Sequence, residues 1–141
     1  MSLQTEFDFD AAMSVKPARV ARSIGGHLGQ LSGEAAEVAV SRAYQQRGLR
    51  QVARRWRGGS GEIDIIFRDG AQLVFVEVKK SRSFARAAER LGSAQMHRIF
   101  DAASEFLAGE PKGQLCETRF DVALVDGIGR IEIIENAFGH F

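Results

Sequence analysis

Residues 61–79 read GEIDIIFRDGAQLVFVEVK, and the architecture expected for the whole chain follows from them. The halves of this stretch, residues 63–67 and 73–78, are runs of β-branched and aromatic residues, which favour strands. Between them lies Asp69-Gly70, and an Asp-Gly pair is a strong signal for a two-residue hairpin loop. The second run begins with successive apolar residues, so we expect this strand to be covered on both faces. The sequence therefore predicts a central hairpin.

One face of this hairpin carries three carboxylates and a lysine, namely Glu62, Asp64, Glu77 and Lys79. Residues two apart in a strand share a face, and this alternation brings the four side chains together. If the Asp-Gly pair forms the loop, Glu62 lies opposite Glu77 and Asp64 lies diagonal to it, at ~7–8 Å. Opposed carboxylates repel, so this face needs positive charge. Lys79 supplies one charge, and a divalent cation held by oxygen ligands would be Mg²⁺ or Mn²⁺ rather than zinc.

Two interpretations of these carboxylates remain open. Asp64 and Glu77 can hold a metal ion, or the polar side chains can simply face water at the edge of the hairpin. A Glu-x-Lys pattern alone means little, because residues 110–112 repeat it in a segment whose proline and glycines predict a loop. The hairpin copy differs because its strand is apolar and a second carboxylate lies across the turn.

The residues around the hairpin predict an α/β domain. A first helix is expected from about residue 33, with Ser32 as its N-cap and Gly48 just past its end. The remaining expected elements are strands at residues 51–56, 119–125 and 130–134 and a helix at residues 93–107. We expect three layers, in which a mixed central sheet of about five strands has helices on both sides.

Composition and termini narrow the class of protein. The 141 residues are 45% hydrophobic and 26% charged, which excludes collagen-like, acidic disordered and disulfide-framework classes. Residues 1–29 show no sustained period and are predicted to be a flexible segment before a domain of residues 30–141. The single cysteine, Cys116, indicates a reducing compartment. With no apolar run of ~18 residues and no signal-peptide pattern, we expect a cytoplasmic protein that makes no membrane contact.

The net charge of +1 conceals a strong local bias. Between Glu37 and Glu62 the chain has six arginines and no acidic residue. A second basic run, residues 79–90, is interrupted only by Glu89. Such runs predict either a phosphate-binding face or an ordinary solvated basic surface.

Several motifs resemble the YraN-like family of bacterial proteins: GEIDII and LVFVEVK in the hairpin with Arg82 nearby, then RFDV and ENAF towards the C-terminus. The resemblance covers about residues 29–138. It implies the restriction-endonuclease-like fold of the PD-(D/E)XK nucleases, which include archaeal Holliday-junction resolvases. The implied activity is hydrolysis of phosphodiester bonds with a divalent metal.

The resemblance also implies a role for each matching residue. Asp64 and Glu77 correspond to the two acidic residues of the motif, Lys79 to its lysine and Glu34 to the glutamate of the first helix. Gln95 lies where the family more often carries lysine, and glutamine can still bond a backbone oxygen. The residues expected to grip nucleic acid are Arg54, Arg55, Arg57, Lys80, Arg82, Arg86 and Gln95.

The expected function is therefore Mg²⁺- or Mn²⁺-dependent cleavage of nucleic acid, DNA before RNA, with branched or recombination intermediates as candidate substrates. Cleavage of a four-way junction would require two sites and hence a homodimer. Two alternatives remain: a nucleic-acid-binding module that keeps the fold without turnover, and a protein-interaction domain with a basic face. Two further residues are expected to be structural, Trp56 packed on the sheet and Asp121 paired with Arg119.

Overall fold

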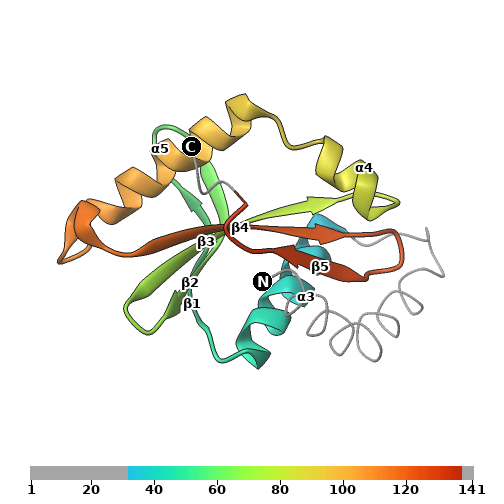
Figure 1. Cartoon of the computed structure of the whole chain (residues 1–141), viewed down its shortest axis with the longest axis horizontal. Coiled ribbons are helices and arrows are strands. Elements are labelled where there is room, and N and C mark those ends of the chain that lie inside the picture. The colour runs from blue at the N-terminus through green and yellow to red at the C-terminus, as the bar shows by residue number, and fades with distance from the viewer. Residues whose placement is uncertain (1–31, 138–141) are drawn as a thin grey trace.

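The structure, a computed structural model, describes residues 32–137, so the predicted flexible segment 1–29 lies outside the described residues. Its elements are, in order, α3 (Gly33–Gln46), β1 (Arg50–Arg57), β2 (Glu62–Asp69), β3 (Gln72–Lys80), α4 (Phe84–Glu89), α5 (Ser93–Leu107), the 3-10 turn η1 (Gly113–Leu115), β4 (Thr118–Val125) and β5 (Ile131–Ile134). The five strands form one sheet in the order β1-β2-β3-β4-β5. Only the β3–β4 pair is parallel, and it is joined by the crossover through α4 and α5 (Figure 1).

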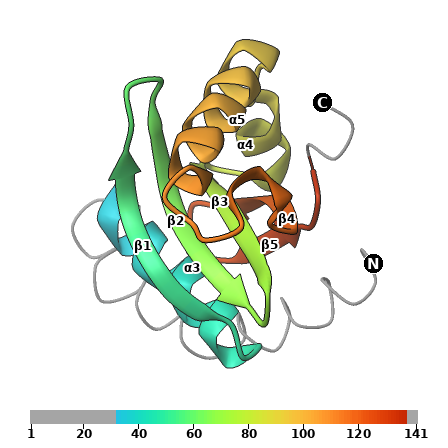
Figure 2. The same ribbon diagram turned by 90° about the vertical axis from the view of Figure 1, so that its left-hand side faces the viewer.

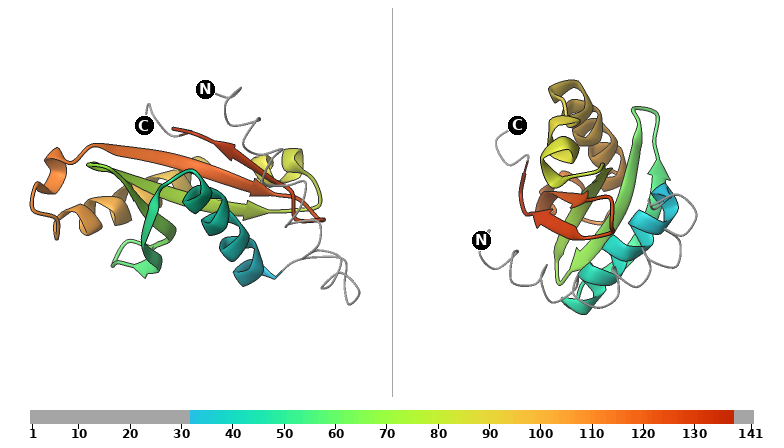
Figure 3. Two further views of the ribbon diagram at one scale, coloured as in Figure 1. Left: turned by 90° about the horizontal axis from the view of Figure 1, so that it is seen from below. Right: turned by 90° about the vertical axis from the view of Figure 1, so that its right-hand side faces the viewer.

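Helices cover both faces of this sheet, with α3 on one side and α4 and α5 on the other (Figure 2). The view from the opposite end of the molecule shows the same three layers (Figure 3). Each face has its own core of buried side chains, one around α3 and one around α5. The predicted three-layer α/β fold with a mixed five-stranded sheet is therefore confirmed.

Helix α3 begins and ends where the sequence predicts. The Ser32 hydroxyl accepts a hydrogen bond from the N–H of Ala35 at 3.0 Å, which satisfies one free donor of the first turn. Beyond the helix Gly48 has φ +95°, a conformation that glycine adopts without strain. Tyr44 is fully buried and stacks on Phe67 of β2, with ring centroids 4.5 Å apart. This contact anchors the C-terminal half of α3 to the sheet.

Aromatic side chains join α5 to the other face of the sheet. The Trp56 ring meets Phe106 of α5 edge to face, with centroids 5.4 Å apart. Phe75 and Phe120, on neighbouring strands, stack at 5.2 Å beneath the same helix. Trp56 is thus packed against the sheet, as expected from the sequence.

The hairpin loop lies one residue later than predicted. Asp69 pairs with Gln72, so the loop consists of Gly70 and Ala71 rather than Asp69 and Gly70. Gly70 has φ +62°, which fits hairpin turns that place glycine at the first loop position. Continuing this register beyond Ile65–Val76 puts Asp64 opposite Glu77, not diagonal to it.

Helix α4 and turn η1 were not predicted. α4 is short and buries only Ala87, so it lacks the repeated apolar positions by which a longer helix is recognised. Its start does carry a capping residue, Ser83, whose hydroxyl accepts a hydrogen bond from the Arg86 N–H at 3.2 Å. Among residues 32–137, no helix has the length and apolar character needed to cross a bilayer.

Candidate active site

The candidate site lies where β2 and β3 stop pairing. Their last recorded pair is Ile65–Val76. Beyond it, Asp64 Oδ2 accepts a hydrogen bond from the backbone N–H of Val78 at 2.8 Å. Alternation along β2 also breaks here, because Ile63 packs in the core beneath α5 whereas Ile65 packs beneath α3. The two strands therefore separate at Asp64, which fixes its carboxyl group beside the end of β3.

Glu77 is the buried carboxyl of the site, with 6% of the residue exposed. Its Oε2 accepts a hydrogen bond from the Gln95 side-chain amide of α5 and lies 3.4 Å from Lys79 Nζ. Burial, and then the charge of Asp64, raise the pKa of Glu77 to about 8, although Lys79 acts in the opposite direction. A carboxyl in this state retains its proton near neutral pH unless more positive charge is supplied.

Burial also raises the pKa of Asp64, and the charges of Glu37 and Glu62 act in the same direction. The N–H of Val78 opposes this shift. Asp64 and Glu77 form a hydrogen bond with each other that lowers the pKa of Asp64 and raises that of Glu77. This interaction favours the protonated form of Glu77.

A second glutamate of α3, Glu37, acts on Asp64. The side chain of Glu34, which the resemblance favoured, is 66% exposed, and its carboxylate lies 3.6 Å from the Arg54 guanidinium. The side chain of Glu37 is only 12% exposed, and its charge contributes to the raised pKa of Asp64. Glu37 follows Glu34 by three residues, so the two glutamates are neighbours on one face of the helix.

Arg55 connects Glu37 to the sheet. The flanking pairs Arg54–Ile65 and Trp56–Ile63 place Arg55 opposite Asp64. It has φ +54°, a left-handed conformation that costs about 1–2 kcal/mol outside glycine. From there Arg55 Nε donates a hydrogen bond to Glu37 Oε1 at 2.9 Å. A strained residue thus holds Glu37, whose charge acts on Asp64.

The predicted nucleic-acid-binding residues fall into two groups. The three from β1 form ion pairs with nearby glutamates, namely Arg54 with Glu34, Arg55 with Glu37 and Arg57 with Glu62. The other three lie at or after the end of β3. Lys80 is its last residue, Arg82 is exposed between β3 and α4, and Arg86 is exposed within α4. Gln95 belongs to neither group, because its amide bonds Glu77.

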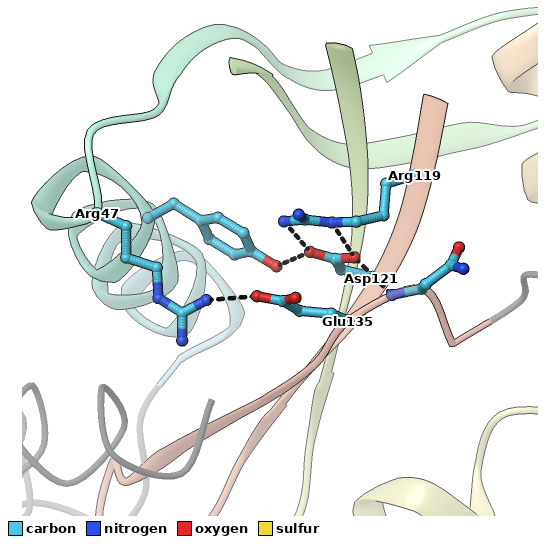
Figure 4. Close-up of polar contacts among 6 residues, drawn as sticks. Arg47, Arg119, Asp121 and Glu135 are labelled. Carbon is cyan, nitrogen blue, oxygen red and sulfur yellow. Dashed lines mark hydrogen bonds and ion pairs between the residues drawn. The ribbon is translucent and has the colours of Figure 1, made fainter. Parts of the chain in front are cut away.

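Asp121 lies outside the site, in a buried network on the α3 side of the sheet (Figure 4). Its carboxylate accepts hydrogen bonds from Arg119 Nε at 2.9 Å and from Tyr44 Oη at 2.8 Å. The backbone N–H of Asn136 is a further donor at 2.9 Å. The expected pairing with Arg119 is confirmed, and Asp121 joins α3, β4 and the segment after β5.

The donor set at Asp64 and Glu77 suits a hard divalent cation. Two carboxylates lie together, and a cation between them would replace the proton that they share. Within residues 32–137 there is no group of three or more Asp, Glu, His or Cys side chains arranged to hold a metal. Mg²⁺ commonly uses one or two carboxylates and completes its shell with water and substrate oxygens, so these residues fit it.

Fold and site define a three-layer α/β domain with paired carboxylates and a lysine where two central strands separate. Residues 36–125 match a family described as "Uncharacterised protein family UPF0102". A UPF0102 protein of Ruegeria pomeroyi is 64% identical over 115 residues, covering 82% of this chain and 94% of that protein. Another, from Cereibacter sphaeroides, is 61% identical over 115 residues, covering 82% and 98%. The chain belongs to the UPF0102 (YraN-like) family, as its motifs predicted.

Proposed function

We propose that this protein is a metal-dependent nuclease that hydrolyses phosphodiester bonds in DNA. The observation that carries the proposal is the juxtaposition of Asp64, Glu77 and Lys79 at the end of the central hairpin. Two adjacent carboxyls in a mostly buried place are unfavourable for folding, as the pKa of about 8 at Glu77 indicates. Perturbed carboxyls with a specific charged partner are typical of functional sites.

Each residue has a role in this proposal. The carboxylates of Asp64 and Glu77 hold Mg²⁺ or Mn²⁺, and the hydrogen bonds from Val78 and Gln95 orient those carboxylates. A divalent ion at this position supplies charge stabilisation for the phosphate and lowers the pKa of water. Lys79, close to Glu77, orients the attacking water or neutralises charge that develops in the transition state.

The cationic side chains that follow β3 supply the grip on the nucleic-acid backbone. Arg82 and Arg86 are exposed, and Lys80 lies next to Lys79 at the end of the strand. Branched or recombination intermediates are the candidate substrates, and a four-way junction would be cut by a homodimer. The arginines of β1 contribute less because glutamates already offset their charge.

The test compares the wild type with Glu77→Gln on linear, flapped and four-way-junction DNA, and on RNA of the same sequence, in Mg²⁺ or Mn²⁺. Glu89→Gln, which removes one carboxylate from the exposed end of α4, is the matched control. We expect cleavage by the wild type and the control and none by Glu77→Gln. No cleavage by any of the three, with equal DNA binding, would favour the binding module instead.

A further inference from the structure

The loop between β1 and β2, residues 58–61, presents several hydrogen-bond donors to one anion. The N–H of Gly59 lies 2.7 Å from Oε1 of Glu105, a residue of α5. The N–H and the hydroxyl of Ser60 lie 3.0 Å and 2.6 Å from its Oε2. The Ser60 hydroxyl, followed by the Gly59 N–H, lowers the pKa of Glu105, an exposed residue. The loop is therefore a cradle built for an anion.

The absence of a side chain at Gly58 leaves room for the carboxylate that the loop binds. A Cβ there would lie 2.1 Å from Oε1 of Glu105 and 2.9 Å from a ring carbon of Trp56. Any other residue would push the bound carboxylate aside. The N–H of Gly58 also donates to the carbonyl oxygen of Gly61 at 2.8 Å, which closes the loop, and the next two N–H groups donate to Glu105.

Two cations flank this cradle. Arg57 precedes the loop and, although it lies 3.7 Å from the Glu62 carboxylate, its side chain is 78% exposed. Arg98 of α5 lies beside Gly61, where a Cβ would be 3.7 Å from Arg98 Cβ. Converging N–H and hydroxyl donors on a loop flanked by two arginines form the kind of site that binds phosphate oxygens.

We propose that residues 58–61 bind a phosphodiester group of a nucleic-acid strand, and that the Glu105 carboxylate occupies this cradle until the strand displaces it. The choice of ligand rests on the proposed nuclease function. The donor residues Gly59 and Ser60 precede Asp64 by five and four residues, which is at most about 17 Å of extended chain. That length equals the axial rise of about four to five nucleotides, so a strand held here can reach the candidate active site.

A purely structural role for Glu105 makes the opposite prediction. If Glu105 only fastens the loop, its removal loosens the donors and leaves nucleic-acid affinity unchanged or weaker. If it competes with phosphate, its removal strengthens binding. Glu105→Gln separates the two effects further, because it keeps one acceptor for the loop while it removes the charge.

The test measures binding of a short fluorescent DNA strand in EDTA, so that no cleavage is involved. The variants are Glu105→Ala, Glu105→Gln, the double variant Glu105→Ala/Ser60→Ala, and Asp101→Ala, which removes an exposed carboxylate from the same helix. We expect Glu105→Ala to bind about two- to fivefold more tightly than Asp101→Ala, Glu105→Gln to lie between them, and the double variant to lose the gain. Equal affinities of Glu105→Ala and Asp101→Ala would overturn the proposal.

Amide NMR of Glu105→Ala identifies the source of the phosphate. We expect the Gly59 and Ser60 resonances to shift with the DNA strand. Shifts with inorganic phosphate but none with DNA would overturn the assignment to nucleic acid. Failure of this proposal can be distinguished from failure of the nuclease proposal. Tighter DNA binding by Glu105→Ala without any cleavage would contradict only the nuclease function, whereas cleavage with unchanged binding would contradict only the phosphate site.

Discussion

Oδ2 of Asp64 accepts the hydrogen bond of the Val78 backbone N–H at 2.8 Å, so a side chain of β2 completes the pairing where the ladder between β2 and β3 ends. Val78 lies between Glu77 and Lys79 in sequence. One bond therefore positions Asp64 relative to both partners. This arrangement brings two carboxyl groups together in a mostly buried place, which destabilises the fold when both are charged. The first two predictions concern the resulting pH dependence of stability and of metal binding.

The pKa of about 8 at Glu77 predicts a pH-dependent loss of stability. A carboxyl whose pKa is raised on folding contributes stability below its unfolded pKa, near 4.5, and loses it as pH rises through 8. Glu77→Gln resembles the protonated form and lacks this loss. In EDTA we expect it to unfold with about 1–3 kcal/mol more free energy than the wild type at pH 8.5, and with little difference at pH 4.5. Urea denaturation at both pH values, with Glu89→Gln as control, measures this. A difference that is constant with pH would contradict it.

Metal binding should also depend on pH, but in the opposite direction: the affinity for the ion should rise with pH, whereas the stability of the metal-free fold falls. A cation between Asp64 and Glu77 must displace their shared proton, so its affinity should rise between pH 6 and pH 8.5. At a concentration about tenfold above Kd, Mg²⁺ would stabilise the fold by about 1.4 kcal/mol. Thermal unfolding with and without the ion measures this. Asp64→Asn should abolish the shift in Tm, whereas Asp69→Asn, at the exposed end of the same hairpin, should keep it.

Most of the fold could be predicted because its elements have clear periods. α5 repeats apolar residues at helical spacing, and β3 is apolar on both faces because helices cover both. The register of the hairpin was wrong by one residue, because Asp69-Gly70 and Gly70-Ala71 are both acceptable loops and the glycine took the first position. α4 was missed because one buried alanine leaves no period.

The site was predictable as far as strand alternation extends. Glu77 and Lys79 share a face in any register, and Asp64 falls on that face too. The sequence did not predict that Glu37, rather than Glu34, acts on Asp64. That difference depends on the rotation of α3 against the sheet, which is set by buried residues such as Tyr44. Nor does any local pattern indicate that Gln95, from another layer, bonds Glu77.

Lys79 provides a test of chemistry rather than binding. Because its amino group lies 3.4 Å from Glu77, we expect Lys79→Met to lower the single-turnover cleavage rate about 10²–10³-fold while DNA affinity in EDTA changes little. Lys112→Met is the matched control, because Lys112 ends the second Glu-x-Lys copy and is exposed. In that copy Glu110 bonds Arg68 at 3.0 Å and is not part of the site. Equal rate losses in the two variants would contradict a role for Lys79.

The network at Asp121 should affect stability and not cleavage. Tyr44→Phe removes one donor to a fully buried carboxylate, and we expect a loss of about 1–3 kcal/mol in the free energy of unfolding. Arg119 and the Asn136 N–H still satisfy Asp121, so the fold should persist. Urea denaturation and a cleavage assay on the same sample check both parts. An unchanged stability, or a lost activity in a folded variant, would contradict this assignment.

The salt dependence of DNA binding separates the two groups of basic residues. Each phosphate that a cation neutralises contributes about 0.9 to the slope of log K against log salt. Arg86 is exposed on α4, and we expect Arg86→Gln to lower the slope by about that amount. Arg54 lies 3.6 Å from Glu34, so its charge is already offset and Arg54→Gln should change the slope much less. Titrations of the wild type and both variants across a salt series, in EDTA, measure the two slopes directly. A larger change for Arg54→Gln than for Arg86→Gln would mean that the strand crosses β1 and breaks the glutamate pairs, instead of following α4.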